Sequence, residues 1–100
     1  MAHKTNVSQE VTDMAAIAKA MSHPVRIYIL QTLSKLDACC YSGNIAEELG
    51  INRSALSLHL KELKYAGLIQ GETEPPYIKY CINKENWAKA KELYSSLFNL

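Results

Sequence analysis

The residues of this chain best suited to chemistry are its three cysteines, Cys39, Cys40 and Cys81. Two of them are adjacent in the stretch DACCYSGN, just ahead of a segment with helical spacing, and the third lies in YIKYCIN. Thiolates act as nucleophiles, redox centres and ligands for soft metal ions. Three interpretations are therefore open at this point: a metal or metalloid site, a thiol redox or persulfide switch, and cysteines that serve as core, since free cysteine is among the most buried residue types.

The composition indicates what kind of protein carries these thiols. One hundred residues with 48% hydrophobic and 21% charged side chains are typical of one globular domain rather than a disordered chain. No apolar run approaches the roughly 18 residues of a membrane span, and the first residues, MAHKTNVSQE, lack the apolar core of a signal peptide. We therefore expect a cytoplasmic protein without a membrane partner, in which the cysteines are free thiols rather than a disulfide framework.

Apolar residues at helical spacing predict four helices in the first two thirds of the chain. The first covers about 8–21 with Ser8 as its N-cap, and the second covers 23–36 with Pro24 in its first turn. A short helix over 44–49 ends at Gly50, and a longer one over 53–66 ends before Gly67, because glycine readily adopts the left-handed conformation of a helix end.

The rest of the chain predicts a hairpin and a final helix. Residues 68–82 form two short strands around Pro75 and Pro76, and residues 84–98 form an amphipathic helix. The order α-α-α-α-β-β-α over residues 1–100 predicts a single domain, mainly α with a small β-hairpin wing, which is a winged helix-turn-helix.

The stretch NIAEELGINRSALSLHLKEL carries the helix-turn-helix pattern. Ala46 is small where two helices cross, Gly50 occupies the turn, and Leu56 and Leu60 point into the core. The opposite face of the second helix carries hydroxyls, which suit base edges and phosphates, cations, which suit phosphates, and one leucine, which suits a thymine methyl. The predicted DNA-binding residues are Arg53, Ser54, Ser57, Leu58, Lys61 and Lys64.

Two other classes of function are weighed against DNA binding. An enzyme is not expected, because the chain has no glycine-rich phosphate loop, no Ser/His/Asp set and no paired carboxylates in a pocket-forming context. A protein-binding winged helix with structural cysteines is the stronger alternative, since the net charge is only +1. The local balance favours DNA, because three cations face the single carboxylate Glu62 between Arg53 and Lys64.

Three stretches resemble the ArsR/SmtB family of small bacterial repressors. KAMSHPVRIYILQTL is similar to the entry motif of the family, GNIAEELGINRSALSLHLKELKYAGLI to its helix-turn-helix, and YIKYCI to the return strand of its wing. The resemblance spans about residues 12–98. It implies a homodimer joined through the first and last helices, a pseudo-palindromic double-stranded operator, and repression that an inducer relieves. The wing departs from the pattern, because GETEPP places Glu72 and Glu74 at a tip that often carries cations. We expect this wing to contribute little to DNA affinity.

The resemblance also suggests where an inducer binds. The last helix, ENWAKAKELYSSLFNL, has no histidine for the zinc-type site of the family, and Cys39 and Cys40 depart from the Cys–x–Cys of its arsenic-type site. A short strand at CYSG that pairs with YIKYCIN brings Cys81 within reach of Cys39 or Cys40. Three thiolates suit As(III) or Sb(III), so we expect these ions as inducers bound by Cys39, Cys40 and Cys81, with no cofactor needed for folding. Adjacent residues of a strand point to opposite faces, however, so at most one of the two faces Cys81.

Overall fold

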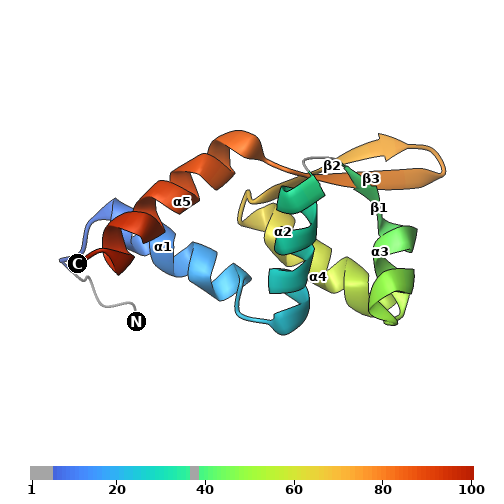
Figure 1. Ribbon diagram of the computed structural model, residues 1–100, viewed down its shortest axis with the longest axis horizontal. Helices are drawn as coiled ribbons and strands as arrows, with labels where there is room; N and C mark the ends of the chain where they lie inside the picture. The colour runs from blue at the N-terminus through green and yellow to red at the C-terminus, as the bar shows by residue number, and fades with distance from the viewer. Residues whose placement is uncertain (1–5, 37–38) are drawn as a thin grey trace.

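The computed structural model describes residues 6–36 and 39–100 and has a winged helix-turn-helix fold (Figure 1). This confirms the predicted fold class. In chain order the elements of the described part are α1 (Gln9–Ala20), α2 (Pro24–Leu36), β1 (Cys40–Tyr41), α3 (Ser42–Leu49), α4 (Arg53–Tyr65), β2 (Ile69–Glu74), β3 (Tyr77–Ile82) and α5 (Lys84–Phe98).

The ends of the helices follow from local hydrogen bonds. The Ser8 and Asn52 side chains accept the N–H groups of Val11 and Ala55, which caps the starts of α1 and α4. Gly50 has φ of 68° between α3 and α4, in the left-handed region where a side chain is strained. This turn lets α4 cross α3 to form the helix-turn-helix.

The third helix begins two residues before the predicted start at Asn44. The short strand β1 ends at Tyr41, and α3 starts directly at Ser42 with no side-chain cap. The difference arises because Ser42 and Gly43 look like a loop in sequence, whereas β1 runs straight into the helix. The beginning of α3 is therefore tied to the sheet.

A three-stranded antiparallel sheet with the order β1-β3-β2 forms the wing and its base. Cys40 pairs with Tyr80 and Tyr41 with Lys79, so the two residues of β1 lie on the outer side of β3. The predicted pairing of CYSG with YIKYCIN is therefore present. Because β1 precedes α3, this sheet joins the wing to the helix-turn-helix.

The core lies between α2, α4 and the base of the wing. Leu56, Leu60 and Leu63 of α4 have at most 1% of their surface exposed, and they pack with the buried side chains of Ile29, Leu30, Leu33, Ile45, Ala46, Leu68, Ile69 and Ala90. Ala46 is buried where α3 meets α4, as the helix-turn-helix pattern predicts. The apolar stripe of α4 thus holds this helix with its polar side toward solvent.

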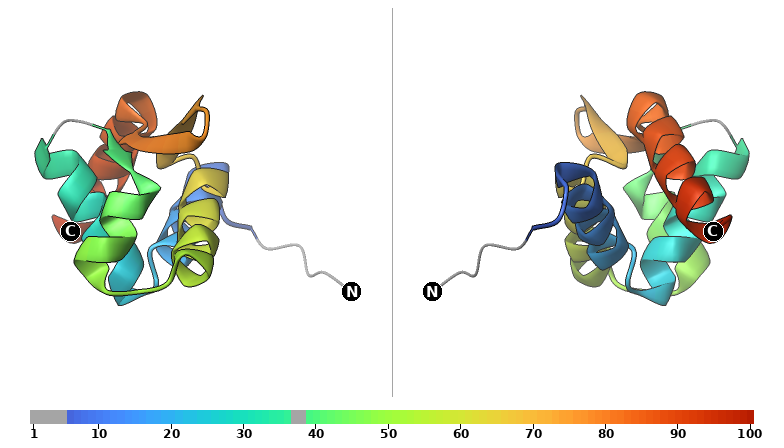
Figure 2. Two further views of the ribbon diagram at one scale, coloured as in Figure 1. Left: turned by 90° about the vertical axis from the view of Figure 1, so that its right-hand side faces the viewer. Right: turned by 90° about the vertical axis from the view of Figure 1, so that its left-hand side faces the viewer.

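The molecule has two ends with different elements. Helices α1 and α5 lie at one end, and α3, the start of α4 and the tip of the wing lie at the other (Figures 1 and 2). The Tyr94 hydroxyl of α5 donates a hydrogen bond to the Met14 carbonyl of α1, and this bond holds α5 against α1. Within residues 6–36 and 39–100, no helix combines the length and the apolar character that crossing a membrane requires.

The two faces of α4 predict effects of different size on stability. Leu60 is 1% exposed and Leu58 is 59% exposed on the same helix. We expect Leu60→Ala to lower the free energy of unfolding by roughly 2–5 kcal/mol through lost burial and a cavity. Leu58→Ala is the matched control, with an expected change within about 0.5 kcal/mol. Urea denaturation followed by circular dichroism measures both, and equal losses would show that α4 is not held by this stripe.

Candidate nucleic-acid interface and thiol pair

The outer face of α4 presents all six residues predicted to bind DNA. Arg53, Ser54, Ser57, Leu58, Lys61 and Lys64 are all exposed. The Lys61 ammonium lies 5.9 Å from the centroid of the Tyr65 ring, one turn further along. Tyr65 is itself 78% exposed, so it extends this polar and cationic surface toward the end of the helix.

Arg53 differs from the other cations in its surroundings. Its guanidinium lies against Gly43 at the start of α3, where an added Cβ would be 2.8 Å from Nη2. The same side chain lines a cleft of about 480 Å³ between α3 and the wing, together with Tyr41, Tyr77 and other residues. Arg53 therefore links the exposed face of α4 to the start of α3.

The acidic tip of the wing is partly neutralised. Glu74 accepts a hydrogen bond from the Tyr41 hydroxyl at 2.7 Å and forms an ion pair with the Lys79 ammonium at 3.1 Å. These two partners, Tyr41 first, lower the pKa of Glu74. Tyr41 also packs edge to face with Tyr77, with ring centroids 5.7 Å apart. The β2–β3 hairpin brings Glu74 near Tyr77 and Lys79, and the β1–β3 register adds Tyr41 from another part of the chain, which no local sequence pattern predicts.

The cysteines do not behave as one group of three. Cys39 and Cys81 form a disulfide across the sheet, with Cα atoms 4.3 Å apart, and Cys40 keeps a free thiol. The expectation of three free thiols is therefore wrong. The Cys40–Tyr80 register makes Cys39 the next residue opposite Cys81, so the pairing of the strands brings these two sulfurs together.

Cys40 points to the other face of β1, as the alternation along a strand requires. It lines a small cavity between α2 and α3 with Ile29, Leu33, Glu48 and other residues. Burial, followed by the nearby Glu48 carboxylate, raises the pKa of the Cys40 thiol. Within the described residues, no group of three or more His, Cys, Asp or Glu side chains is placed to hold a metal ion. The predicted three-thiolate set is thus not assembled here.

The fold is that of a winged helix-turn-helix protein, and known proteins resemble this chain in sequence and in fold. A helix-turn-helix domain family matches residues 21–72. The regulator CmtR of Mycobacterium bovis is 35% identical over 77 residues, which cover 77% of this chain and 64% of CmtR. YgaV of Escherichia coli K12, another helix-turn-helix transcriptional regulator, is 38% identical over 71 residues, which cover 71% of each chain. This chain therefore spans less than two thirds of the length of CmtR.

A solved structure agrees with these relatives. The homodimeric winged helix-turn-helix DNA-binding domain Mb0332 of M. bovis superposes with a TM-score of 0.72 at 26% identity, covering 99% of this chain and 91% of that one. The chain belongs to the ArsR/SmtB family of winged helix-turn-helix transcriptional regulators, a family of regulators and not of enzymes.

The surroundings of Cys40 predict slow alkylation. A raised pKa leaves less thiolate at a given pH, and the thiolate is the reactive form. We expect iodoacetamide to modify Cys40 of the folded, oxidised protein more slowly than the same thiol in denaturant, with the rate still rising at a pH where an ordinary cysteine has levelled off. Mass spectrometry over time measures this. Equal rates in the folded and unfolded chain would contradict the burial of this thiol.

Proposed function

We propose that this protein is a dimeric, DNA-binding transcriptional repressor whose operator affinity is set by the redox state of Cys39 and Cys81. The observation that carries the proposal is the position of this pair. It joins the residue just before β1, and hence the start of the helix-turn-helix, to the return strand of the wing. A chemical change there acts on both parts of the proposed DNA-binding end, the helix-turn-helix and the wing.

The surface of α4 supports binding to double-stranded DNA. Ser54 and Ser57 are short enough to approach base edges, and Lys61 and Lys64 suit phosphates. Leu58 is 59% exposed in the middle of this surface, where it is suited to contact a thymine methyl. Because Lys79 is engaged by Glu74, the wing offers little positive charge to the DNA, and α4 carries most of the contact.

Exposed apolar side chains on α1 and α5 support a homodimer through these helices. Val11 of α1 is 50% exposed, and Leu97 and Phe98 of α5 are 44% and 78% exposed. A two-fold dimer joined at this end can present its two α4 helices on one face, one on each side of the axis. Such a dimer reads a pseudo-palindromic operator with half-sites about one helical turn apart.

The chemistry of the pair is reversible thiol oxidation. Cys39 and Cys81 together lose two protons and two electrons when they form the disulfide, and a low-molecular-weight disulfide that accepts them is reduced to two thiols. Cys39 is exposed and Cys81 is only 9% exposed, so Cys39 is the sulfur that a reagent reaches. A cleft of about 230 Å³ beside the pair, lined by Gln70, Lys84 and others, gives small reagents access.

In this proposal the reduced protein binds the operator and the disulfide releases it. The crosslink restrains the start of α3 against the wing, and α3 packs directly on α4. The two redox forms then differ in how freely α4 and the wing adjust to DNA. A coupling of this kind between two sites typically changes affinity by about 5–150-fold.

Trivalent arsenic or antimony is a second candidate inducer, at the same pair. The strand register that brings Cys39 and Cys81 together when oxidised also keeps their thiols adjacent when reduced. Two convergent thiolates suit a soft ion of this kind. Cys40 lies on the opposite face and does not complete a three-thiolate site.

The first test is the salt dependence of binding to duplex DNA from upstream of the gene for this protein. We expect the affinity of the reduced protein to fall steeply with salt, and the slope to decrease by about 1 for each phosphate-contacting lysine that is lost, as in Lys61→Ala. Lys89→Ala on α5 is the matched control, because it removes a lysine from the other end of the molecule. Fluorescence anisotropy measures binding. No salt-dependent binding would favour the alternative of a protein-binding winged helix.

The second test addresses the thiols in the same assay. We expect oxidation to weaken operator binding by about tenfold, within the usual range of coupling between sites. Cys39→Ser and Cys81→Ser should bind like the reduced protein with or without oxidant, whereas Cys40→Ser should respond like the wild type. Arsenite added to the fully reduced protein tests the second inducer. A Cys40→Ser protein that no longer responds to either treatment would contradict the assignment of the pair.

A further inference from the structure

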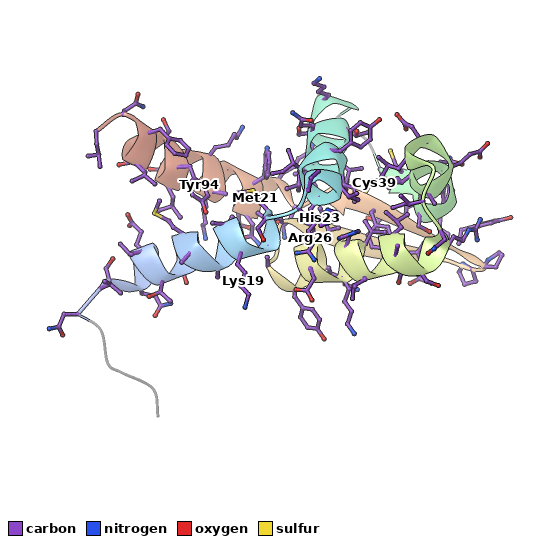
Figure 3. All side chains as sticks on the ribbon, turned by 90° about the horizontal axis from the view of Figure 1, so that it is seen from below. Lys19, Met21, His23, Arg26, Cys39 and Tyr94 are labelled. Carbon is purple, nitrogen blue, oxygen red and sulfur yellow. A yellow bond between two sulfur atoms is a disulfide. The ribbon has the colours of Figure 1, made fainter. Side chains whose placement is uncertain are left out.

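One arginine connects three helices at the junction of α1, α2 and α4. Arg26 of α2 donates its Nε–H to Nδ1 of His59 on α4, with 3.0 Å between the nitrogens. Its Nη1 group donates to the carbonyl of Ala20, the last residue of α1, at 3.3 Å. Figure 3 shows Arg26 beside His23, where the turn between α1 and α2 meets α4. We call Arg26, His59 and His23 the polar joint.

The direction of this hydrogen bond defines the state of His59. A guanidinium has N–H donors and no acceptor, and it stays charged at any pH in which the protein folds. Nδ1 of His59 must therefore carry a lone pair, and the imidazole is neutral with its proton on Nε2. A protonated ring has an N–H on both nitrogens, so it cannot accept from Arg26.

His23 reinforces this state. Its ring centroid lies 4.3 Å from that of His59. Its own Nδ1 accepts the backbone N–H of Val25 at 3.1 Å, which caps the start of α2. Both rings are thus held as acceptors, and a charge on one opposes a charge on the other.

Burial and the neighbouring side chains of His59 all disfavour its protonated form. Burial, then His23, then Arg26 lower the pKa of His59 below its ordinary value of 6.5. His23 faces it from the start of α2 and Arg26 from α2 itself, while α1 contributes the uncharged carbonyl of Ala20. On α4, the carboxylate Glu62 lies one turn further along and is exposed to solvent.

We propose that Arg26 and His59 are positioning residues for operator binding, and that protonation of His59 breaks their hydrogen bond and weakens that binding. The polar joint sets the orientation of α4 against the α1–α2 turn. Helix α1 belongs to the proposed dimer face, so this orientation also sets how the two α4 helices of a dimer are spaced. The inference rests on the proposed DNA-binding function and is independent of the cysteines.

The sign of the pH effect separates this proposal from ordinary electrostatics. Above the pKa of His59 the ring is neutral and the joint is intact; as the pH falls through that pKa, the bond is lost and Arg26 faces a second cation. Extra positive charge on a DNA-binding protein normally strengthens its attraction to phosphates. The polar joint predicts the opposite, which is weaker binding at lower pH.

The experiment is a pH profile of operator binding by the fully reduced protein, from about pH 8 to about pH 5 at constant ionic strength, a window in which histidine titrates. We expect the wild type to lose at least about fivefold in affinity toward the acid end, the lower range of coupling between sites. His59→Asn keeps an acceptor close to the place of Nδ1 and does not titrate. It should bind like the wild type near pH 8 and show no acid loss.

Two further variants complete the design. His59→Phe removes the acceptor and should bind weakly across the whole range, with circular dichroism showing that it is folded. His23→Asn preserves an acceptor for the start of α2, so it should retain the acid loss if His59 is the titrating group. Affinity that rises with acid, or an acid loss that persists in His59→Asn, would overturn the positioning role. No specific binding by the wild type even near pH 8 would instead overturn the DNA-binding function.

Discussion

The pairing of β1 with β3 is the interaction on which the arrangement of the wing and the helix-turn-helix depends. A strand of two residues, Cys40 and Tyr41, holds the start of α3 against the wing. It places the disulfide at one end of the strand and the contact between Tyr41 and Glu74 at the other. The wing, the thiol pair and the helix-turn-helix are thereby positioned relative to one another by a few backbone hydrogen bonds.

The features that the sequence predicted correctly are those with local causes. Caps such as Ser8, turns such as Gly50 and the leucine stripe of α4 leave their marks within a few residues, and the winged helix follows from their order. The choice between Cys39 and Cys40 as the partner of Cys81 could not be made in this way. It depends on a strand register, and a slip of one residue exchanges the faces. A two-residue strand has no pattern from which that register can be read.

Two other contacts that the sequence did not predict also depend on tertiary structure. Arg26 and His59 are 33 residues apart, and nothing in the periodicity of either helix shows that a hydrogen bond joins them. The hydrogen bond that Glu74 accepts likewise comes from Tyr41, which belongs to a different element. In both cases the residue types can be read from the sequence, but the contacts between them form only in the tertiary structure. Helix α4 is consequently fixed by an apolar stripe that sequence reveals and by a polar joint that it does not.

The disulfide also divides the chain into a covalent ring and two open arms. Its cysteines are 42 residues apart in sequence, and the segment between them contains β1, α3, α4, β2 and the first part of β3. In the chain-entropy description, closing a ring of this size removes freedom from the unfolded state worth roughly 4 kcal/mol. Helices α1, α2 and α5 lie outside the ring. Oxidation therefore closes the helix-turn-helix and the wing into one covalent unit, while α1, α2 and α5 are held to it only by non-covalent contacts.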